Sequence, residues 1–202
     1  MARHRKKKQA RNTVAIVGDG KTERIYFADV RDTDRPENLH IFPDFPRKVG
    51  SYNGVLKQAV DLKQDYYRVY ALIDMDKVIR DHREEAYRAD KAAAEKAGVI
   101  VLENNPCFEM WLLVHFMYTG RLFNSCAQVS QLLQHRYRIP GYEKSEKFCV
   151  NAGLYRNYKT QLTEQGIPNA RRLEYNRADQ DPLFPRAETF RFFEWYLEES
   201  VK

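Results

Sequence analysis

The segment at residues 69–78, VYALIDMDKV, constrains the fold of this chain more than any other stretch. It opens with an apolar run that is typical of a strand buried on both faces, as in a parallel sheet. Asp74 and Asp76 follow, and the alternation of side chains along a strand predicts that both carboxylates point the same way. Ligands of open α/β sheets bind beyond the carboxyl ends of the strands. Because adjacent carboxylates repel each other without a cation, and Mg²⁺ prefers such oxygens, the segment predicts a metal site.

Segments of strand and helix character alternate around this one. Apolar and β-branched runs predict further strands at residues 13–17, 40–45 and 99–102. Apolar residues at helical spacing predict helices at residues 21–30, 52–65 and 81–97. Pro43 and Pro46 limit the length of the second strand, and Gly98 ends the third helix. The alternation predicts an α/β fold with a mainly parallel four-stranded sheet flanked by helices.

The chain changes character after the fourth predicted strand. Asn105 suits a helix N-cap and Pro106 the first helical position, with Glu109 in the first turn to complement the helix dipole. Residues 125–165 and 186–199 are predicted to be mainly helical. We therefore expect a basic, disordered arm, an α/β core and a C-terminal helical extension packed on that core, at residues 1–12, 13–120 and 121–202 respectively.

The net charge of +6 is concentrated at the amino terminus. Six lysines and arginines lie within the first eleven residues, and removing them from the 34 basic residues leaves 28, equal to the 28 acidic residues. Such an arm binds phosphates without sequence preference, or serves only to keep the chain soluble.

Three further features indicate a cytoplasmic protein. No apolar run approaches the roughly 18 residues of a membrane span, and the amino terminus lacks the apolar core of a secretion signal. The cysteines Cys107, Cys126 and Cys149 are widely spaced and form no CxxC pair. That pattern indicates free thiols in a reducing cytosol and no structural zinc.

Acidic residues elsewhere are placed to join Asp74 and Asp76. Asp19 ends the first predicted strand much as Asp74 ends the third, and Glu23 lies one helical turn further on. Glu109 opens the helix after the fourth strand. If these acids converge, they suit one or two Mg²⁺ ions acting on a phosphodiester. The structural alternatives are a turn residue for Asp19, a solvated helix face for Glu23 and a dipole partner for Glu109.

Two motifs resemble those of other enzymes, but one lacks a required residue and the other lies at the wrong strand. Gly20-Lys21-Thr22 after a strand resembles a phosphate-binding loop, but the pattern G-x-x-x-x-G-K-[ST] requires glycine where this chain has Ala15. Residues 74–78 fit the D-x-D-x-[TV] pattern of haloacid-dehalogenase-like phosphatases, yet that motif ends the first strand of its domain and here it ends the third. Both nucleotide hydrolysis and phosphatase activity are therefore disfavoured.

Three blocks of the chain together resemble a known family. IVGDGKTERIYF, ALIDMD and NNPCFEMWLLVHF are similar, in that order, to the signature blocks of the RloB-like proteins. Those are small bacterial proteins of defence and abortive-infection loci, often encoded beside a large ATPase. Their pattern resembles the Toprim fold, which carries a glutamate after the first strand and a D-x-D after the third, together binding Mg²⁺. The resemblance spans most of residues 10–200.

The resemblance implies roles for individual positions. Asp74 and Asp76 match the D-x-D metal ligands, and Glu23 matches the second acid of the first block. Asp19 stands where the family has glutamate, and its side chain is shorter by one methylene. The shorter reach is compatible with metal binding and weakens the case for a general acid–base role. The third block is matched by Asn105, Glu109, Trp111 and His115.

Structural roles compete with functional ones at three places. His115 lies one helical turn after Trp111 among apolar residues, which favours a hydrogen-bonded core histidine over a catalytic one. Trp111 is likewise expected in the core rather than as a stacking platform. Residues 136–159 carry several tyrosines, arginines and lysines and suit either a grip on nucleic acid or an ordinary helical surface, since Glu143 and Glu146 dilute the charge.

Sequence and resemblance together predict a Toprim-like, Mg²⁺- or Mn²⁺-dependent nuclease, the effector of a bacterial anti-phage system. The expected metal ligands are Asp19, Asp74, Asp76 and Glu23. Glu23 or Glu109 would serve as general base, and Lys21 would stabilise developing phosphate charge. The expected partners are DNA or RNA and a controlling ATPase, and the chain is compatible with an oligomer. The alternative is a non-catalytic adaptor that binds nucleic acid or the ATPase and keeps a degenerate Toprim site.

Overall fold

A computed structural model of the chain describes residues 12–46, 51–177 and 181–201. The basic arm predicted at residues 1–12 therefore lies outside the described residues, apart from Asn12. Within the described ranges, no helix is both long and apolar enough to cross a membrane.

The centre of the fold is a five-stranded sheet with the order β2-β1-β3-β4-β5. The strands are β1 (Thr13–Val17), β2 (His40–Asp44), β3 (Arg68–Asp74), β4 (Ile100–Asn105) and β5 (Arg186–Ala187). The first four are parallel, as predicted, and β5 runs antiparallel to β4. The prediction of only four strands was wrong, because β5 has two residues and so leaves no periodic pattern. Pro43 is accommodated because β2 is an edge strand.

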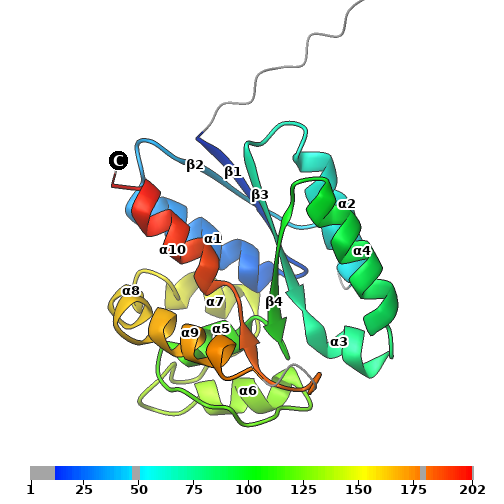
Figure 1. The fold of residues 1–202 in the computed structure, drawn as a ribbon. Helices are drawn as coiled ribbons and strands as arrows, with labels where there is room; N and C mark the ends of the chain where they lie inside the picture. Colours follow the sequence, from blue (N-terminus) through cyan, green and yellow to red (C-terminus); the bar gives the residue numbers. More distant parts are fainter. Residues whose placement is uncertain (1–11, 47–50, 178–180, 202) are drawn as a thin grey trace, which may run out of the picture.

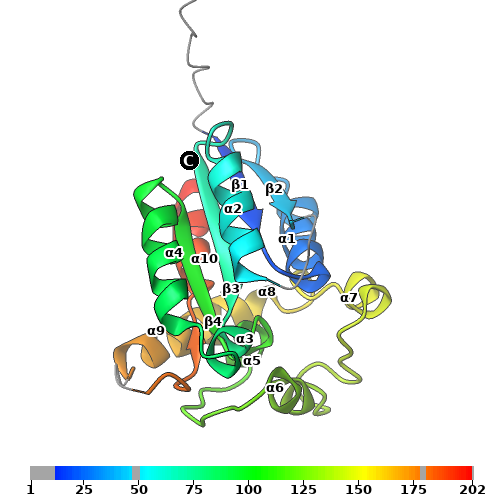
Figure 2. The same ribbon diagram turned by 90° about the vertical axis from the view of Figure 1, so that its right-hand side faces the viewer.

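Helices cover both faces of the sheet (Figures 1 and 2). One face carries α1 (Lys21–Asp34) and α10 (Phe190–Glu199), and the other carries α2 (Tyr52–Leu62) and α4 (Glu84–Lys96). Side chains alternate accordingly, since Leu72 belongs to the core under α1 and α10 while Ile73 belongs to the core under α2. This two-sided burial explains the uninterrupted apolar run in β3. The fold is α/β and is consistent with a Toprim-like arrangement.

Helix α1 is longer than predicted because its polar end makes tertiary contacts. The carboxylate of Asp29 accepts hydrogen bonds from the backbone N–H groups of Tyr155 (2.9 Å) and Arg156 (3.1 Å). Asp34 accepts from the hydroxyls of Tyr155 and Tyr196 at 2.5 and 2.9 Å. The helix predicted at residues 21–30 therefore continues through the polar stretch as far as Asp34.

Shorter helices gather beyond the carboxyl ends of the parallel strands (Figure 1). They are α3 (Met75–Arg80), α5 (Glu109–Val114), α6 (Cys126–Leu133), α7 (Glu146–Ala152), α8 (Lys159–Gln161), a π-helix (Leu162–Gly166) and α9 (Ile167–Tyr175). The prediction that residues 125–165 are mainly helical was only partly right, because extended loops separate α6, α7 and α8.

The turn after β4 differs from the prediction. Asn105 is the last residue of β4 rather than a helix N-cap, and helix α5 begins only at Glu109. The side-chain amide of Asn105 instead donates to the carbonyls of Pro182 (2.9 Å) and Phe184 (2.7 Å). Asn105 therefore fastens the C-terminal segment to the end of the sheet.

The prediction of three free cysteines was wrong. Cys107 and Cys126 form a disulfide, and Cys149 is a buried free thiol. The turn after β4 and the start of α6 bring the two Cα atoms to 5.7 Å, which a disulfide can span. Two cysteines 19 residues apart without a CxxC motif gave no sign of this pairing in the sequence.

Candidate metal centre

Acidic side chains from separate segments meet beyond the carboxyl ends of β1, β3 and β4. Asp74 ends β3, Asp19 lies in the turn after β1, and Glu23 lies in the first turn of α1. Glu109 opens α5, and Asp76 lies in the first turn of α3. We call these five residues the acidic cluster. Asp19 and Asp74 line one cavity, and the charges of Glu23, Glu109 and Asp76 act on Asp74, so these acids lie at the same edge of the sheet.

Glu23 is held in place by the glycine turn before it. A Cβ atom at Gly18 would lie 2.7 Å from the Cβ of Glu23, and one at Gly20 would lie 2.9 Å from its carboxylate. Both positions therefore leave room for the glutamate. Glu23 is 3% exposed, and its Oε2 has no hydrogen-bond partner among the described residues. Burial and the charge of Glu109 raise its pKa to about 7, although Lys144 opposes the shift.

Asp74 is anchored by the backbone. Its Oδ1 accepts a hydrogen bond of 2.8 Å from the N–H of Phe108 in the turn after β4. Burial and the neighbouring charge of Glu23 raise the pKa of Asp74 well above its usual value. A carboxylate in this position is costly when ionised unless a cation compensates it.

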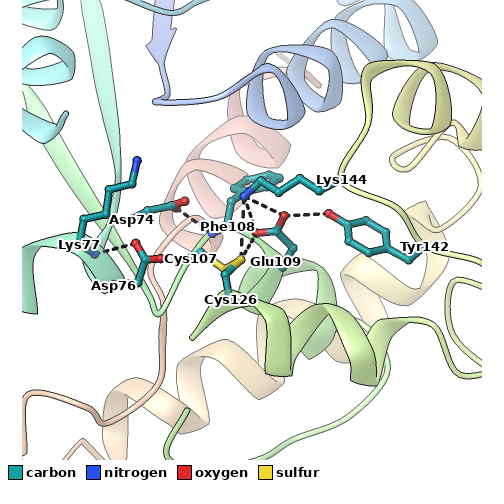
Figure 3. The surroundings of a disulfide bond; sticks show 9 residues. All are labelled: Asp74, Asp76, Lys77, Cys107, Phe108, Glu109, Cys126, Tyr142 and Lys144. Atoms are coloured by element: carbon teal, nitrogen blue, oxygen red, sulfur yellow. Dashed lines mark hydrogen bonds and ion pairs between the residues drawn. A yellow bond between two sulfur atoms is a disulfide. The ribbon is translucent and has the colours of Figure 1, made fainter. Parts of the chain in front are cut away.

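The sequence pattern predicted that Asp76 lies beside Asp74 on the same strand, and this prediction was wrong. The strand ends at Asp74 and the chain turns at once into α3. The carboxylate of Asp76 accepts from the backbone N–H of Lys77 at 2.7 Å, while its own N–H donates to the carbonyl of Pro106 at 2.9 Å. Asp76 therefore reaches the cluster from helix α3, and its side chain does not run alongside that of Asp74 (Figure 3).

Glu109 is fully buried and well supplied with partners. The hydroxyl of Tyr142 donates to it at 2.9 Å, and the ammonium of Lys144 lies 3.0 and 3.2 Å from its two oxygens. The Sγ of Cys126 lies 2.9 Å from Oε2 of Glu109, so the disulfide borders the cluster (Figure 3). Tyr142 belongs to the stretch at residues 136–159, for which a nucleic-acid grip and an ordinary helical surface were both open, and its burial beside Glu109 fits neither role.

Two lysines bring positive charge to the acids. The ammonium of Lys77 lies 3.6 Å from Asp19 at the rim. Burial would lower the pKa of Lys144, but the carboxylates of Glu109, Asp74 and Glu23 outweigh it and raise that pKa above its usual value. A cavity of about 140 Å³ adjoins Asp19 and Asp74 and is lined also by Lys77.

Lys21, predicted to stabilise phosphate charge, points elsewhere. Its ammonium pairs with Glu146 of α7 at 2.6 Å, and both side chains are at least half exposed. Within the described part of the chain, it makes no contact with the acidic cluster, and its catalytic role stays a prediction. Lys144 is the lysine that lies among the acids. It was missed as a site residue because it sits in a polar loop with no motif around it.

The two aromatic positions of the third block belong to the core. Trp111 is fully buried, and its indole N–H donates to the hydroxyl of Tyr26 at 3.2 Å. His115 is buried, with Nδ1 2.7 Å from the carbonyl of Trp111, and burial lowers its pKa to about 4. The burial of both side chains agrees with their predicted place in the core.

The donor set fits a hard divalent cation. Five carboxylates face two lysines, and one buried carboxylate oxygen of Glu23 lacks a partner. Carboxylate oxygens suit Mg²⁺ or Mn²⁺, and Mg²⁺ retains several waters, so the acids need not all touch the ion. Among the described residues, only Cys107, Glu109 and Cys126 place their ligand atoms within 4.8 Å of one another, and the two sulfurs are bonded to each other. The carboxylates must therefore draw closer together to coordinate an ion directly.

Comparison with known proteins identifies a family. A model of the RloB-like proteins matches residues 14–190, which include the glycine turn, β3 and the start of α5. No curated protein and no solved structure matches the chain. Because the family model covers most of the sequence, the chain belongs to the RloB-like family.

Proposed function

We propose that this RloB-like chain is a Mg²⁺- or Mn²⁺-dependent nuclease. The observation that carries the proposal is the buried carboxylate of Glu23, which has an oxygen without a partner and stands in the field of Asp74 and Glu109. Burying such a group without compensation is unfavourable, so the site gains stability from a cation.

Each acid has a part in this proposal. Asp74 and Glu23 would hold the ion from within, and Asp19 and Asp76 would hold it from the rim, directly or through water. Once bound, the ion would orient a phosphodiester and stabilise charge on its oxygens. Asp74 is positioned for this by the N–H of Phe108, which fixes one of its oxygens and leaves the other to a ligand.

If Glu23 does not coordinate the ion, it is instead the best candidate for the general base. In the metal-free chain its pKa is about 7, so it can exchange a proton near neutral pH, whereas an ordinary glutamate would be too weak a base. Its close packing against Gly18 and Gly20 fixes the carboxylate before the reaction, so that no free energy is spent on orienting it during catalysis. Glu109 is less suited to proton transfer because Tyr142 and Lys144 already occupy its oxygens.

The biological setting follows from the family resemblance. We propose that the chain acts in the bacterial cytoplasm as the effector of an anti-phage, abortive-infection system, on DNA or RNA, under the control of a partner ATPase. Control of this kind would prevent an active nuclease from damaging the host's own nucleic acids.

The test is Asp74→Asn, compared with Asp65→Asn as a control at an exposed position away from the cluster. Mixed nucleic acids are incubated with each protein, with and without the ATPase, in Mg²⁺, Mn²⁺ or EDTA. We expect metal-dependent cleavage by the wild type and Asp65→Asn, and a loss of at least about 100-fold in Asp74→Asn, since a metal ligand is removed. Circular dichroism shows whether the fold is retained.

One observation favours the adaptor alternative. The carboxylates do not form a ready-made ligand set in the described residues, and Lys144 already neutralises part of their charge. An adaptor predicts that toxicity in cells with the partner ATPase survives both Asp74→Asn and Asp76→Asn. Unchanged toxicity in the two folded variants would contradict the nuclease proposal.

A further inference from the structure

We propose that Lys144 is an internal counter-ion that competes with a divalent metal for the acidic cluster, so that metal binding requires its ammonium to withdraw. The inference rests on the proposed function and adds a regulatory step to the same site. It concerns a residue outside the three blocks that carry the family resemblance.

The position of the ammonium is the first observation. It lies 3.0 and 3.2 Å from the two oxygens of Glu109, a bidentate contact, and it interacts electrostatically with Asp74 and Glu23. In the view of Figure 3 it lies between the carboxylates of Asp74 and Glu109. A cation that reaches three acids from three different elements occupies the place where their negative potential is greatest.

The second observation is that Glu109 can release Lys144 without losing all its partners. The hydroxyl of Tyr142, buried beside it, donates to Oε1 at 2.9 Å and remains when the lysine leaves. An incoming metal would take over the charge compensation of Asp74 and Glu23. The exchange therefore replaces one cation by another rather than exposing bare buried carboxylates.

The third observation is that Lys144 has room to leave. It belongs to the loop between α6 and α7, and 45% of its side-chain surface is exposed while its tip contacts the fully buried Glu109. A lysine stem can rotate toward solvent by changing side-chain torsions alone. Withdrawal needs no rearrangement of the sheet.

The consequence is a site whose metal affinity is set by an internal competitor. While Lys144 sits among the acids, a divalent ion must displace it, and the apparent affinity is weaker than that of the carboxylates alone. A partner or substrate phosphate that draws Lys144 outward would strengthen metal binding. The cluster would thereby bind the metal more tightly when a negatively charged ligand is present.

The test measures Mn²⁺ binding by electron paramagnetic resonance in full-length wild type, Lys144→Met, Lys144→Arg and Lys147→Met. Lys147 is a matched control, since it lies three residues further on, is exposed, and makes no contact with the acidic cluster among the described residues. We expect Lys144→Met to bind Mn²⁺ at least about tenfold more tightly, because a competing unit charge is removed. Lys144→Arg should bind no more tightly than the wild type, and Lys147→Met should stay within about twofold of it.

The outcomes are distinct. If Lys144→Met binds Mn²⁺ no more tightly than the wild type, or if Lys147→Met gains as much, the competition is refuted while the metal site stands. If no protein binds Mn²⁺, both this inference and the proposed function fail. Should Lys144→Met not fold, Lys144→Gln replaces it with the same expectation.

Discussion

The carboxylate of Glu103 within β4 and the carboxylates of the acidic cluster are compensated very differently. Glu103 and its partners, which we call the β4–β5 cluster, are joined by three contacts: Glu103 accepts from the hydroxyl of Tyr87 at 3.0 Å, pairs with Lys91 at 2.7 Å and contacts Arg186. Burial opposes its ionisation, but Arg186 and Lys91 lower its pKa overall. In the acidic cluster the balance is reversed, since the pKa values of Glu23 and Asp74 are raised.

The difference separates a structural role from a functional one. Glu103 joins β4, α4 and β5 through partners that satisfy both its oxygens, so its charge is useful in the folded chain itself. Glu23 leaves an oxygen unsatisfied at a cost to stability. The fold gives both oxygens of Glu103 hydrogen-bond partners and leaves one oxygen of Glu23 without one. This difference indicates that the free oxygen of Glu23 serves to bind a ligand.

The largest effect expected from this comparison is that of Glu103→Ala. It would leave the partly buried cations of Arg186 and Lys91 without their buried carboxylate, so we expect the free energy of unfolding to fall by about 3–5 kcal/mol. Urea denaturation measures the change. Glu95→Ala is the matched control, because Glu95 contacts the same Lys91 at 4.0 Å from an exposed position. Its loss should be below about 0.5 kcal/mol. Equal losses of unfolding free energy in the two variants would show that the buried ion pairs of Glu103 stabilise the fold no more than an exposed pair does.

The disulfide gives the next largest effect. It closes a loop of 19 residues at the border of the acidic cluster, and loop entropy predicts that its loss costs about 3 kcal/mol. We expect a reductant to lower the melting temperature of the wild type, and the double variant Cys107→Ser, Cys126→Ser to melt at the same temperature with or without reductant. Thiol titration of the unfolded protein should find one free thiol before reduction and three after it. A wild type that melts identically in both conditions would contradict this expectation.

The apolar pattern was sufficient to predict most of the sheet. The run in β3, the first strand and the end of α4 at Gly98 all follow from local rules of periodicity and turn chemistry, so they agree with the structure. The extra length of α1 does not follow from local rules, because Asp29 and Asp34 are stabilised by contacts with residues more than a hundred positions away.

The site was predictable only in part for the same reason. Asp19, Asp74 and Glu23 follow strand ends and turns, which are local features, and they do converge. Asp76 was assigned to a strand because nothing in MDKVIR marks the start of a helix. The contacts of Lys144 and the pairing of Cys126 depend on how loops return to the sheet. Tertiary packing determines those contacts, and the spacing of residues along the chain does not predict them.

The smallest effect concerns how the ionisation of Glu23 changes the free energy of unfolding. Because burial raises its pKa from 4.5 to about 7, the folded chain holds this proton more tightly than the unfolded chain does. The contribution of Glu23 to the free energy of unfolding is therefore greatest below about pH 4.5, falls as the pH rises to about 7, and stays low above that. Glu23→Gln should remove this decline and stabilise the protein at pH 8 by roughly 2 kcal/mol.

Urea denaturation in EDTA at pH 5 and pH 8 measures this effect, with Glu37→Gln as an exposed control that should follow the wild type. A stabilised Glu23→Gln protein that also loses Mn²⁺ binding would show that the same carboxylate weakens the fold and holds the ion. If Glu23→Gln is instead destabilised as strongly as Glu103→Ala, Glu23 is a structural group like Glu103. The contrast between the two clusters would then disappear.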